Sequence, residues 1–204
     1  MRLRILSLFA VLALTAAVAS ARQMFGSSDV PAAPPIGSKM PGIKLVTLTG
    51  ESTSLSAYSN KNGILVIFVS VQCPVSNAYN ERMEALAQEW RARGFGVVGI
   101  NSNRTEPADA VAAHAREHNL TFPILKDNNN VLADALGASF TPETYVFDAS
   151  GTLRYHGRID DSKDPSGISK RDLRDALQAI ADGRPIAVTE TKAFGCTIKR
   201  VPRS

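Results

Sequence analysis

The chain is poor in the residues from which metal and lipid-attachment sites are usually built. Its 204 residues contain two cysteines, three histidines and one tryptophan. The cysteines are Cys73 and Cys196, so no cysteine follows the apolar N-terminal stretch where a lipid anchor would be attached. The sequence also has no P-loop and no dinucleotide-binding glycine pattern. We therefore expect no bound cofactor.

The sequence also lacks a third ligand for its one pair of histidines at metal-binding spacing. His114 and His118 lie four residues apart on a predicted helix, but no further residue of suitable type accompanies them. We expect these to be surface histidines and expect no metal site.

Positive charge is present but is not organised along one segment. The formal net charge is +4, the basic residues are scattered, and aromatic residues make up only 6% of the chain. A nucleic-acid-binding protein would be expected to show a basic helix face or a platform of aromatic side chains. We therefore expect no nucleic-acid partner, and the 44% hydrophobic and 21% charged residues are ordinary for one globular domain.

The N-terminus has the three parts of a secretory signal. Residues 1–4 carry two arginines, residues 5–18 are almost purely apolar, and residues 19–21 are small. This order predicts a signal peptide over residues 1–21 that is cleaved on export. The apolar run is short for a membrane span, so an uncleaved anchor is the minor alternative. We expect a periplasmic or secreted protein with no stable membrane insertion after cleavage.

The rest of the chain is predicted to be one domain with two irregular ends. Residues 22–37 are rich in proline and small residues, which is typical of a flexible linker. Residues 38–184 alternate between apolar runs and helical patterns. Residues 185–204 form a tail that has no clear periodicity and carries Cys196.

The alternation within residues 38–184 predicts an α/β sheet with right-handed crossovers. The central strand is expected at residues 64–71, which are continuously apolar and rich in β-branched side chains. Its predicted neighbours are strands at 44–49, 52–55, 95–100, 122–125, 144–147 and 153–156, and helices at 74–93, 107–118, 131–136 and 173–180.

Cys73 has the most reactive predicted setting in the chain. It follows the central strand and precedes Pro74, which is favoured at the first position of a helix. A thiol at this place faces unpaired backbone N–H groups and the positive end of the helix dipole, and both favour the thiolate. The alternative is an unreactive cysteine that packs as a small apolar side chain.

Three segments resemble one family of redox proteins. They are residues 69–79 (VSVQCPVSNAY), Thr141-Pro142 ahead of a predicted strand, and residues 155–161 together with 192–199. The chain resembles thioredoxin-like redoxins of the alkyl hydroperoxide reductase and thiol-specific antioxidant superfamily, and within it an exported peroxiredoxin-like subgroup. The resemblance implies a thioredoxin-like fold, with a central mixed sheet flanked by helices.

The resemblance also implies roles for individual residues. Pro142 would follow a cis peptide bond and place the backbone of Thr141 opposite Cys73, where it could bond an extended partner chain. Ser76 stands where a thioredoxin has its second cysteine, which removes the nearby resolving thiol. Ser70 stands where a peroxiredoxin has a hydroxyl near the attacking thiol. The arginine that would hold the thiolate and peroxide is Arg158 or Arg154.

The role of Cys196 stays open at this stage. It could resolve a sulfenic acid or mixed disulfide on Cys73, form a permanent disulfide with it, or remain unpaired. The first role predicts an exported thiol–disulfide oxidoreductase or peroxiredoxin-like antioxidant protein. It would act on a protein thiol or disulfide, or on a small peroxide, and use an external thiol reductant. The second predicts a non-catalytic binding module with a structural Cys73–Cys196 disulfide, and metal delivery is the least favoured hypothesis.

Overall fold

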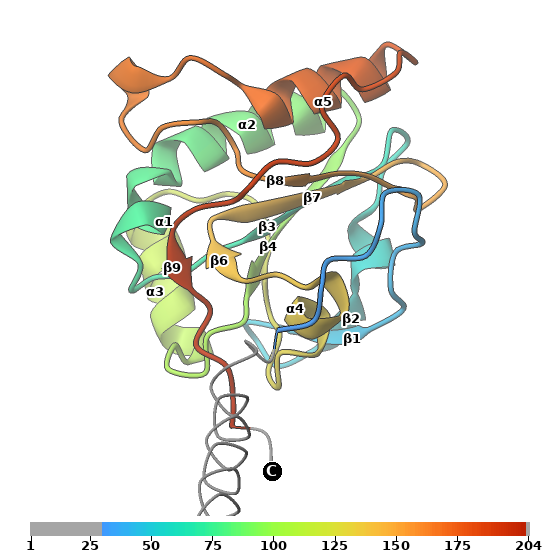
Figure 1. The fold of residues 1–204 in the computed structure, drawn as a ribbon. Helices are drawn as coiled ribbons and strands as arrows, with labels where there is room; N and C mark the ends of the chain where they lie inside the picture. The colour runs from blue at the N-terminus through green and yellow to red at the C-terminus, as the bar shows by residue number, and fades with distance from the viewer. Residues whose placement is uncertain (1–29, 203–204) are drawn as a thin grey trace, which may run out of the picture.

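The computed structural model describes residues 30–202, and the predicted signal peptide over residues 1–21 lies outside this range. A seven-stranded mixed sheet runs through the described domain in the order β2-β1-β5-β4-β3-β7-β8 (Figure 1). Its strands are β1 (Lys44–Thr47), β2 (Ser52–Ser54), β3 (Ile64–Phe68), β4 (Gly96–Asn101), β5 (Ile124–Lys126), β7 (Glu143–Phe147) and β8 (Leu153–Gly157). A separate two-stranded sheet joins β6 (Phe140–Thr141) to β9 (Cys196–Thr197).

The predicted central strand is confirmed as β3. It pairs in parallel with β4 and antiparallel with β7, and all five of its residues are buried. The regular strand ends at Phe68 rather than at residue 71. The N–H group of Val71 donates to the side chain of Glu106 instead of continuing the sheet, so the chain turns toward Cys73 there.

Alternation along β3 divides the core into two layers. Leu65 and Ile67 point to one face, where side chains of α2, α3 and α5 pack. Ile64, Val66 and Phe68 point to the other face, which α4 and the N-terminal segment cover. The helices are α1 (Pro74–Ala78), α2 (Asn80–Ala92), α3 (Ala108–Glu117), α4 (Val131–Leu136) and α5 (Asp172–Ala181), with short 3-10 turns at Leu55–Tyr58 and Pro165–Gly167. The predicted mixed sheet flanked by helices is therefore confirmed.

The last residues of the predicted linker pack against the domain. Ile36 packs beside the second core layer, and the N–H group of Gly37 donates to the carbonyl of Leu153 at 2.9 Å. The segment just before residue 38 is therefore held in place by contacts that its composition did not predict.

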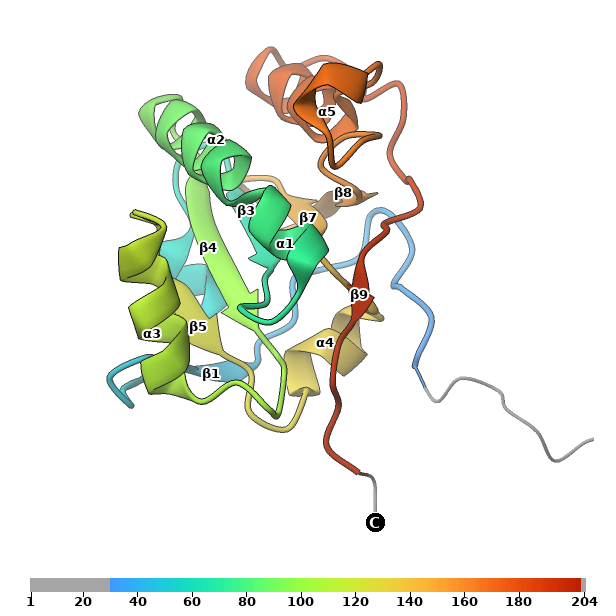
Figure 2. The same cartoon turned by 90° about the vertical axis from the view of Figure 1, so that its left-hand side faces the viewer.

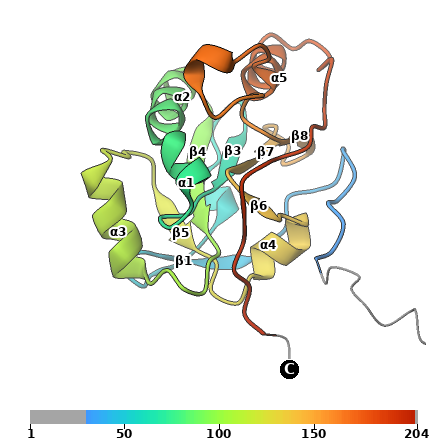
Figure 3. The same cartoon turned by 60° about the vertical axis from the view of Figure 1, so that its left-hand side comes forward.

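The tail after α5 follows a defined path along one side of the domain (Figures 2 and 3). It runs past β8, crosses beside α1 as β9, and continues along α4 (Figure 3). Across residues 30–202, no helix has both the length and the apolar character to span a membrane.

Candidate active site

Cys73 is the N-cap residue of α1, as the sequence predicted. Its sulfur accepts a hydrogen bond from the N–H group of Ser76 at 3.2 Å, and Pro74 occupies the start of the helix. The residue is only 1% exposed. The helix breaks at Tyr79 before α2 begins, so Cys73 caps a short helix rather than the long one expected.

Ser70 and Ser76 lie beneath the turn that carries Cys73. The hydroxyl of Ser76 accepts a hydrogen bond from the N–H group of Ser70 at 3.2 Å. The hydroxyl of Ser70 donates to a carboxylate oxygen of Glu106 at 2.6 Å. Both serines are buried and brace the turn. The Ser70 hydroxyl is engaged by Glu106, so in this structure it is not directed at the thiol.

The peptide bond between Thr141 and Pro142 is cis. This arrangement places the carbonyl oxygen of Thr141 3.2 Å from the sulfur of Cys73, with the thiol as donor. The predicted approach of the Thr141 backbone to Cys73 is therefore present.

Cys196 lies on β9, directly beside this site. Thr141 pairs with Cys196, and Phe140 with Thr197, in antiparallel register. Both cysteines are free thiols, and Thr141 contacts both of them: its carbonyl oxygen lies 3.2 Å from the Cys73 sulfur, and its backbone pairs with Cys196. The structure thus brings residues 73, 141 and 196 to one point.

The pKa values of the two thiols are shifted in opposite directions. Burial raises the pKa of Cys73, but interactions with the side chains of Cys196 and Thr141 and with the Ser76 N–H group outweigh it and lower that pKa overall. Burial and the neighbouring Cys73 sulfur raise the pKa of Cys196. Cys73 is therefore the better source of thiolate, which is the nucleophilic form.

Glu106 is a site residue that the sequence reasoning missed. Its carboxylate accepts hydrogen bonds from the N–H groups of Val71 and Gln72 at 3.1 and 3.0 Å, besides the Ser70 hydroxyl. Burial raises the pKa of Glu106, but its hydrogen bonds, led by those from Ser70 and Asn101, lower it overall. The sequence signal was weak, because Glu106 ends a polar loop and only its position after a buried strand marked it.

The loop containing Glu106 also holds the tail. The side-chain oxygen of Asn103 accepts a hydrogen bond from the N–H group of Lys199 at 2.7 Å. The N–H group of Arg104 donates to the carbonyl of Lys199 at 2.9 Å. Beneath the loop, the ammonium group of the buried Lys126 donates to the carbonyl oxygens of Asn103 and Glu106. One loop therefore contacts both cysteine-bearing segments.

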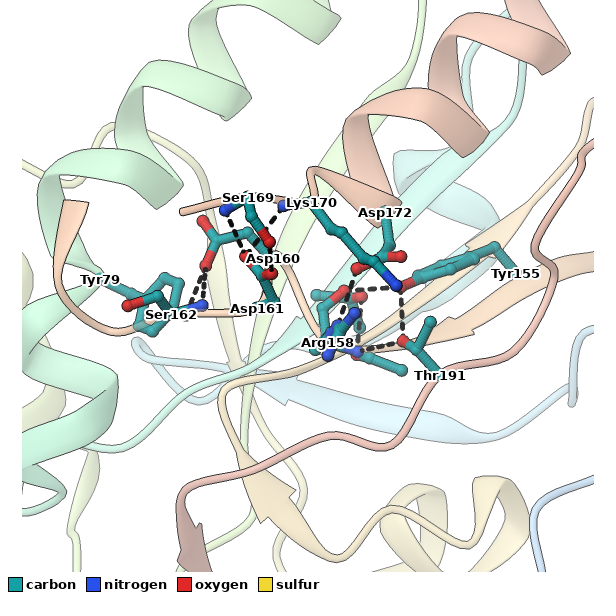
Figure 4. Close-up of polar contacts among 12 residues, drawn as sticks. Tyr79, Tyr155, Arg158, Asp160, Asp161, Ser162, Ser169, Lys170, Asp172 and Thr191 are labelled. Atoms are coloured by element: carbon teal, nitrogen blue, oxygen red, sulfur yellow. Dashed lines mark hydrogen bonds and ion pairs between the residues drawn. The ribbon is translucent and has the colours of Figure 1, made fainter. Parts of the chain in front are cut away.

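Arg158 belongs to a different polar cluster, shown in Figure 4. Its guanidinium Nε lies 2.7 Å from a carboxylate oxygen of Asp172, and this hydrogen bond raises the pKa of Arg158. The backbone N–H of Arg158 and the hydroxyl of Tyr155 both bond the hydroxyl of Thr191, which lies in the tail before β9 (Figure 4). Arg154, the other predicted candidate, pairs with Asp148 at 3.2 Å. The backbone of Arg158 thus helps to hold the tail, while its side chain pairs with Asp172.

His114 lies on α3, and His118 is the C-cap residue of the same helix. The rings of His114 and His118 are 4.3 Å apart, and His114 shares a hydrogen bond with Asn80. Within the part of the chain that the structure describes, no group of three or more histidine, cysteine or acidic side chains is arranged to hold a metal ion.

Comparison with known sequences decides the family. Residues 36–156, more than half of the chain, match the AhpC/TSA family. The chain belongs to the AhpC/TSA family. The matched region ends before the tail, so Cys196 lies outside it.

Similar proteins place this family member among thioredoxin-like proteins. It is 34% identical over 119 residues to the thioredoxin-like protein YneN of Bacillus subtilis, covering 58% of this chain and 68% of YneN. It is 29% identical over 109 residues to the thiol-disulfide oxidoreductase ResA of Halalkalibacterium halodurans, covering 53% of this chain and 60% of ResA. The structure superposes on that of a hypothetical protein from Sinorhizobium meliloti with a TM-score of 0.77 and 29% identity, covering 84% of this chain and 98% of the other. The fold is thioredoxin-like, as the sequence predicted.

Proposed function

We propose that the protein is an exported thiol–disulfide oxidoreductase or peroxiredoxin-like antioxidant protein. In this proposal Cys73 is the nucleophile, and Cys196 resolves the intermediate that forms on it. Its substrate is a disulfide or a small peroxide, and an external thiol returns it to the reduced state.

One observation carries the proposal. Cys196 lies on a strand that pairs with Thr141, and the carbonyl oxygen of Thr141 is 3.2 Å from the sulfur of Cys73. This supplies the second thiol that Ser76 does not. A resolving thiol must be able to reach the sulfur of the first intermediate, and a thiol on the strand beside the Cys73 site meets that need.

With a peroxide, the Cys73 thiolate attacks one oxygen and the O–O bond breaks. The products are a sulfenic acid on Cys73 and an alcohol or water. Cys196 then attacks the sulfenic sulfur, water leaves, and a Cys73–Cys196 disulfide forms. The N–H group of Ser76 stabilises the Cys73 thiolate before attack.

With a disulfide, the Cys73 thiolate attacks one sulfur and releases the other as a thiol. Cys196 then attacks the Cys73 sulfur, releases the second thiol, and closes the same internal disulfide. Two equivalents of an external thiol reduce that disulfide and become oxidised themselves. Both routes therefore end in one oxidised form of the protein.

The names of similar proteins support this chemistry. ResA of Halalkalibacterium halodurans is named a thiol-disulfide oxidoreductase, and DsbE of Yersinia pestis, 30% identical over 122 residues, is named a thiol:disulfide interchange protein. The match covers 60% and 62% of those proteins, so their activities are carried to this chain as part of the proposal.

Intact-mass analysis of alkylated protein tests the proposal. The reduced protein is treated with hydrogen peroxide or glutathione disulfide, quenched with acid, alkylated, and weighed. We expect both thiols to be lost together, as one internal disulfide that opens again in a mildly reducing glutathione buffer. A matched Cys73→Ser variant should form no internal disulfide and consume no peroxide above background.

The same titration separates the alternative function. A disulfide that opens only with strong reductant would indicate a structural bond and favour the non-catalytic binding module. Two thiols that remain free in oxidising buffer would contradict a resolving role for Cys196.

A further inference from the structure

Strand β9 lies where an extended partner chain would bind. A thioredoxin-like site offers the backbone beside the cis-proline to such a chain, in the manner of strand addition to a free edge. Here Thr141 and Phe140 already pair with Cys196 and Thr197 of the same molecule. The cis-proline edge is thus filled by the chain's own tail, and Cys196 stands at the place of a partner cysteine.

The close approach of the tail to this edge depends on Gly195. Its φ angle is +149°, a conformation that side-chain-bearing residues rarely adopt. A Cβ atom at this position would lie 2.1 Å from the carbonyl oxygen of Thr141. The next residue, Cys196, can pair with Thr141 only because residue 195 has no side chain.

Contacts on both sides hold the tail over the site. Before β9, the hydroxyl of Thr191 bonds Tyr155 and Arg158, and the ring of Phe194 packs edge-on against Tyr79 at 6.4 Å between centroids. After β9, Ile198 is buried and its N–H group donates to the carbonyl of Ser139 at 3.0 Å.

The far end of the tail is held in the same way. The guanidinium of Arg200 contacts Asp134 at 3.0 Å and also the carbonyl of Ala138. The N–H group of Val201 donates to the side chain of Asn130 at 2.8 Å. The tail is therefore seated from Thr191 to Val201, and Cys73 beneath it is 1% exposed.

We propose that the seated tail selects the substrate class, so that the site accepts small peroxides and low-molecular-weight disulfides and excludes polypeptide disulfides. The inference rests on the proposed function of Cys73 and Cys196. A polypeptide needs the main-chain edge at Thr141 to be vacant, which requires β9 to leave. A small oxidant needs only one reactive atom to reach the Cys73 sulfur, which side-chain movement of Cys196 or Phe194 allows.

The reaction is the same for either class of disulfide. The reduced protein transfers two electrons to the substrate disulfide, which becomes two thiols, and the Cys73–Cys196 disulfide forms. Only the first attack differs, because a polypeptide disulfide needs the main-chain edge at Thr141 to be vacant and a small disulfide does not. The rate of that first step therefore reports the selection.

A comparison of the oxidation rates with different substrates tests the inference. Reduced full-length protein is mixed with hydrogen peroxide, glutathione disulfide or insulin, and formation of the internal disulfide is followed by quenched alkylation. We expect wild type to react with both small oxidants and to be at least ten-fold slower with the disulfides of insulin. Gly195→Ala should raise the ratio of the insulin rate to the glutathione disulfide rate by ten-fold or more, because it unseats β9.

Gly183→Ala is the matched control, because Gly183 also has a positive φ of +65° but faces open space beyond α5. It should leave the ratio unchanged. Arg200→Ala removes the contacts of the tail with Asp134 and Ala138, so it should also raise the ratio of the insulin rate to the glutathione disulfide rate. This variant replaces Gly195→Ala in the test if Gly195→Ala does not fold.

The outcomes separate the two proposals. Insulin reacting with wild type as fast as glutathione disulfide, or a ratio unmoved by Gly195→Ala and Arg200→Ala, would overturn the selection by the tail. If no oxidant produces an internal disulfide in wild type, the proposed function itself fails.

Discussion

Short-range contacts set the chemistry of Cys73. Burial alone would raise the pKa of this thiol and keep it protonated. The side chains of Cys196 and Thr141 and the backbone N–H group of Ser76 lower that pKa overall. The Cys196 contact is the largest of these lowering effects. The second cysteine therefore activates the first in addition to its proposed role in resolving the intermediate.

Replacing Cys196 should separate activation from resolution. Cys196→Ala removes the thiol that lowers the pKa of Cys73, so we expect that pKa to rise, measured from the ultraviolet absorbance of the thiolate against pH. Cys196→Ser keeps a donor at the same place and should leave that pKa closer to wild type. Neither variant can close the internal disulfide. Equal pKa values of Cys73 in the two variants would contradict the activating contact.

Glu106→Gln should weaken the turn that positions Cys73. An amide in place of the carboxylate directs one N–H group toward backbone or side-chain donors, so we expect a loss of about 1–3 kcal/mol in the free energy of unfolding. We also expect slower oxidation of Cys73 by peroxide. Glu84→Gln is the control, because Glu84 is also bonded at its carboxylate but to Thr121, and should leave the rate of Cys73 oxidation unchanged.

The pH dependence of the free energy of unfolding gives a second test of the role of Glu106. Hydrogen bonding lowers the pKa of Glu106 in the folded protein despite burial. Its carboxylate therefore stabilises the folded protein fully at pH values above the ordinary glutamate pKa of about 4.3. That contribution is lost as the pH falls through the lower folded pKa. In acid denaturation, Glu106→Gln should therefore lose less stability than wild type between neutral and acidic pH.

At the scale of elements, the loop between β4 and α3 links the two cysteine segments. Glu106 holds the turn before Cys73, while Asn103 and Arg104 hold Lys199, three residues beyond Cys196. The loop is polar and its sequence gave no sign of this double contact. Neither of the segments that it joins is adjacent to it in the chain.

Asn103→Ala should loosen the tail without touching the Cys73 turn. Loss of the hydrogen bond to the Lys199 N–H group lowers the effective concentration of Cys196 at Cys73. We expect the equilibrium constant for the internal disulfide, measured in glutathione buffers, to fall about three- to ten-fold, which corresponds to about 0.6–1.4 kcal/mol. The exposed Asn129→Ala, on a neighbouring turn, should leave it unchanged. An unaltered constant in Asn103→Ala would show that the tail is seated by its other contacts.

At the scale of the whole molecule, the fold gathers a site from four distant segments. Cys73 follows β3, Thr141 precedes β7, Glu106 precedes α3, and Cys196 lies in the tail. The tail was expected to be irregular because it has no periodicity. It is instead seated by hydrogen bonds and by the buried side chain of Ile198, which are individual contacts rather than a repeating pattern.

Export is a prediction about the whole chain. Signal peptidase should cleave after Ala21, so the mature protein isolated from the producing cell should begin at Arg22. N-terminal sequencing and intact mass of the exported fraction would check this. A protein that begins at Met1 and stays with the membrane fraction would favour an uncleaved anchor instead.

The sequence by itself determined the fold and the place of the first thiol. The apolar run at residues 64–71 and the Cys73-Pro74 step predicted a buried strand followed by a helix cap, because these signals depend on residues close together in the chain. The thioredoxin-like sheet and the closeness of Thr141 to Cys73 came from the resemblance that three motifs carried.

Only the tertiary structure decided which other residues join the site. Cys196 comes to Cys73 by pairing with Thr141, and Glu106 comes to the same turn from a loop on the next strand. The guanidinium of Arg158 pairs with Asp172, and the backbone N–H group of the same residue bonds Thr191. These contacts join residues that are 14 to 68 positions apart, and no local pattern encodes them, because each depends on how the strands pair and how the tail is seated.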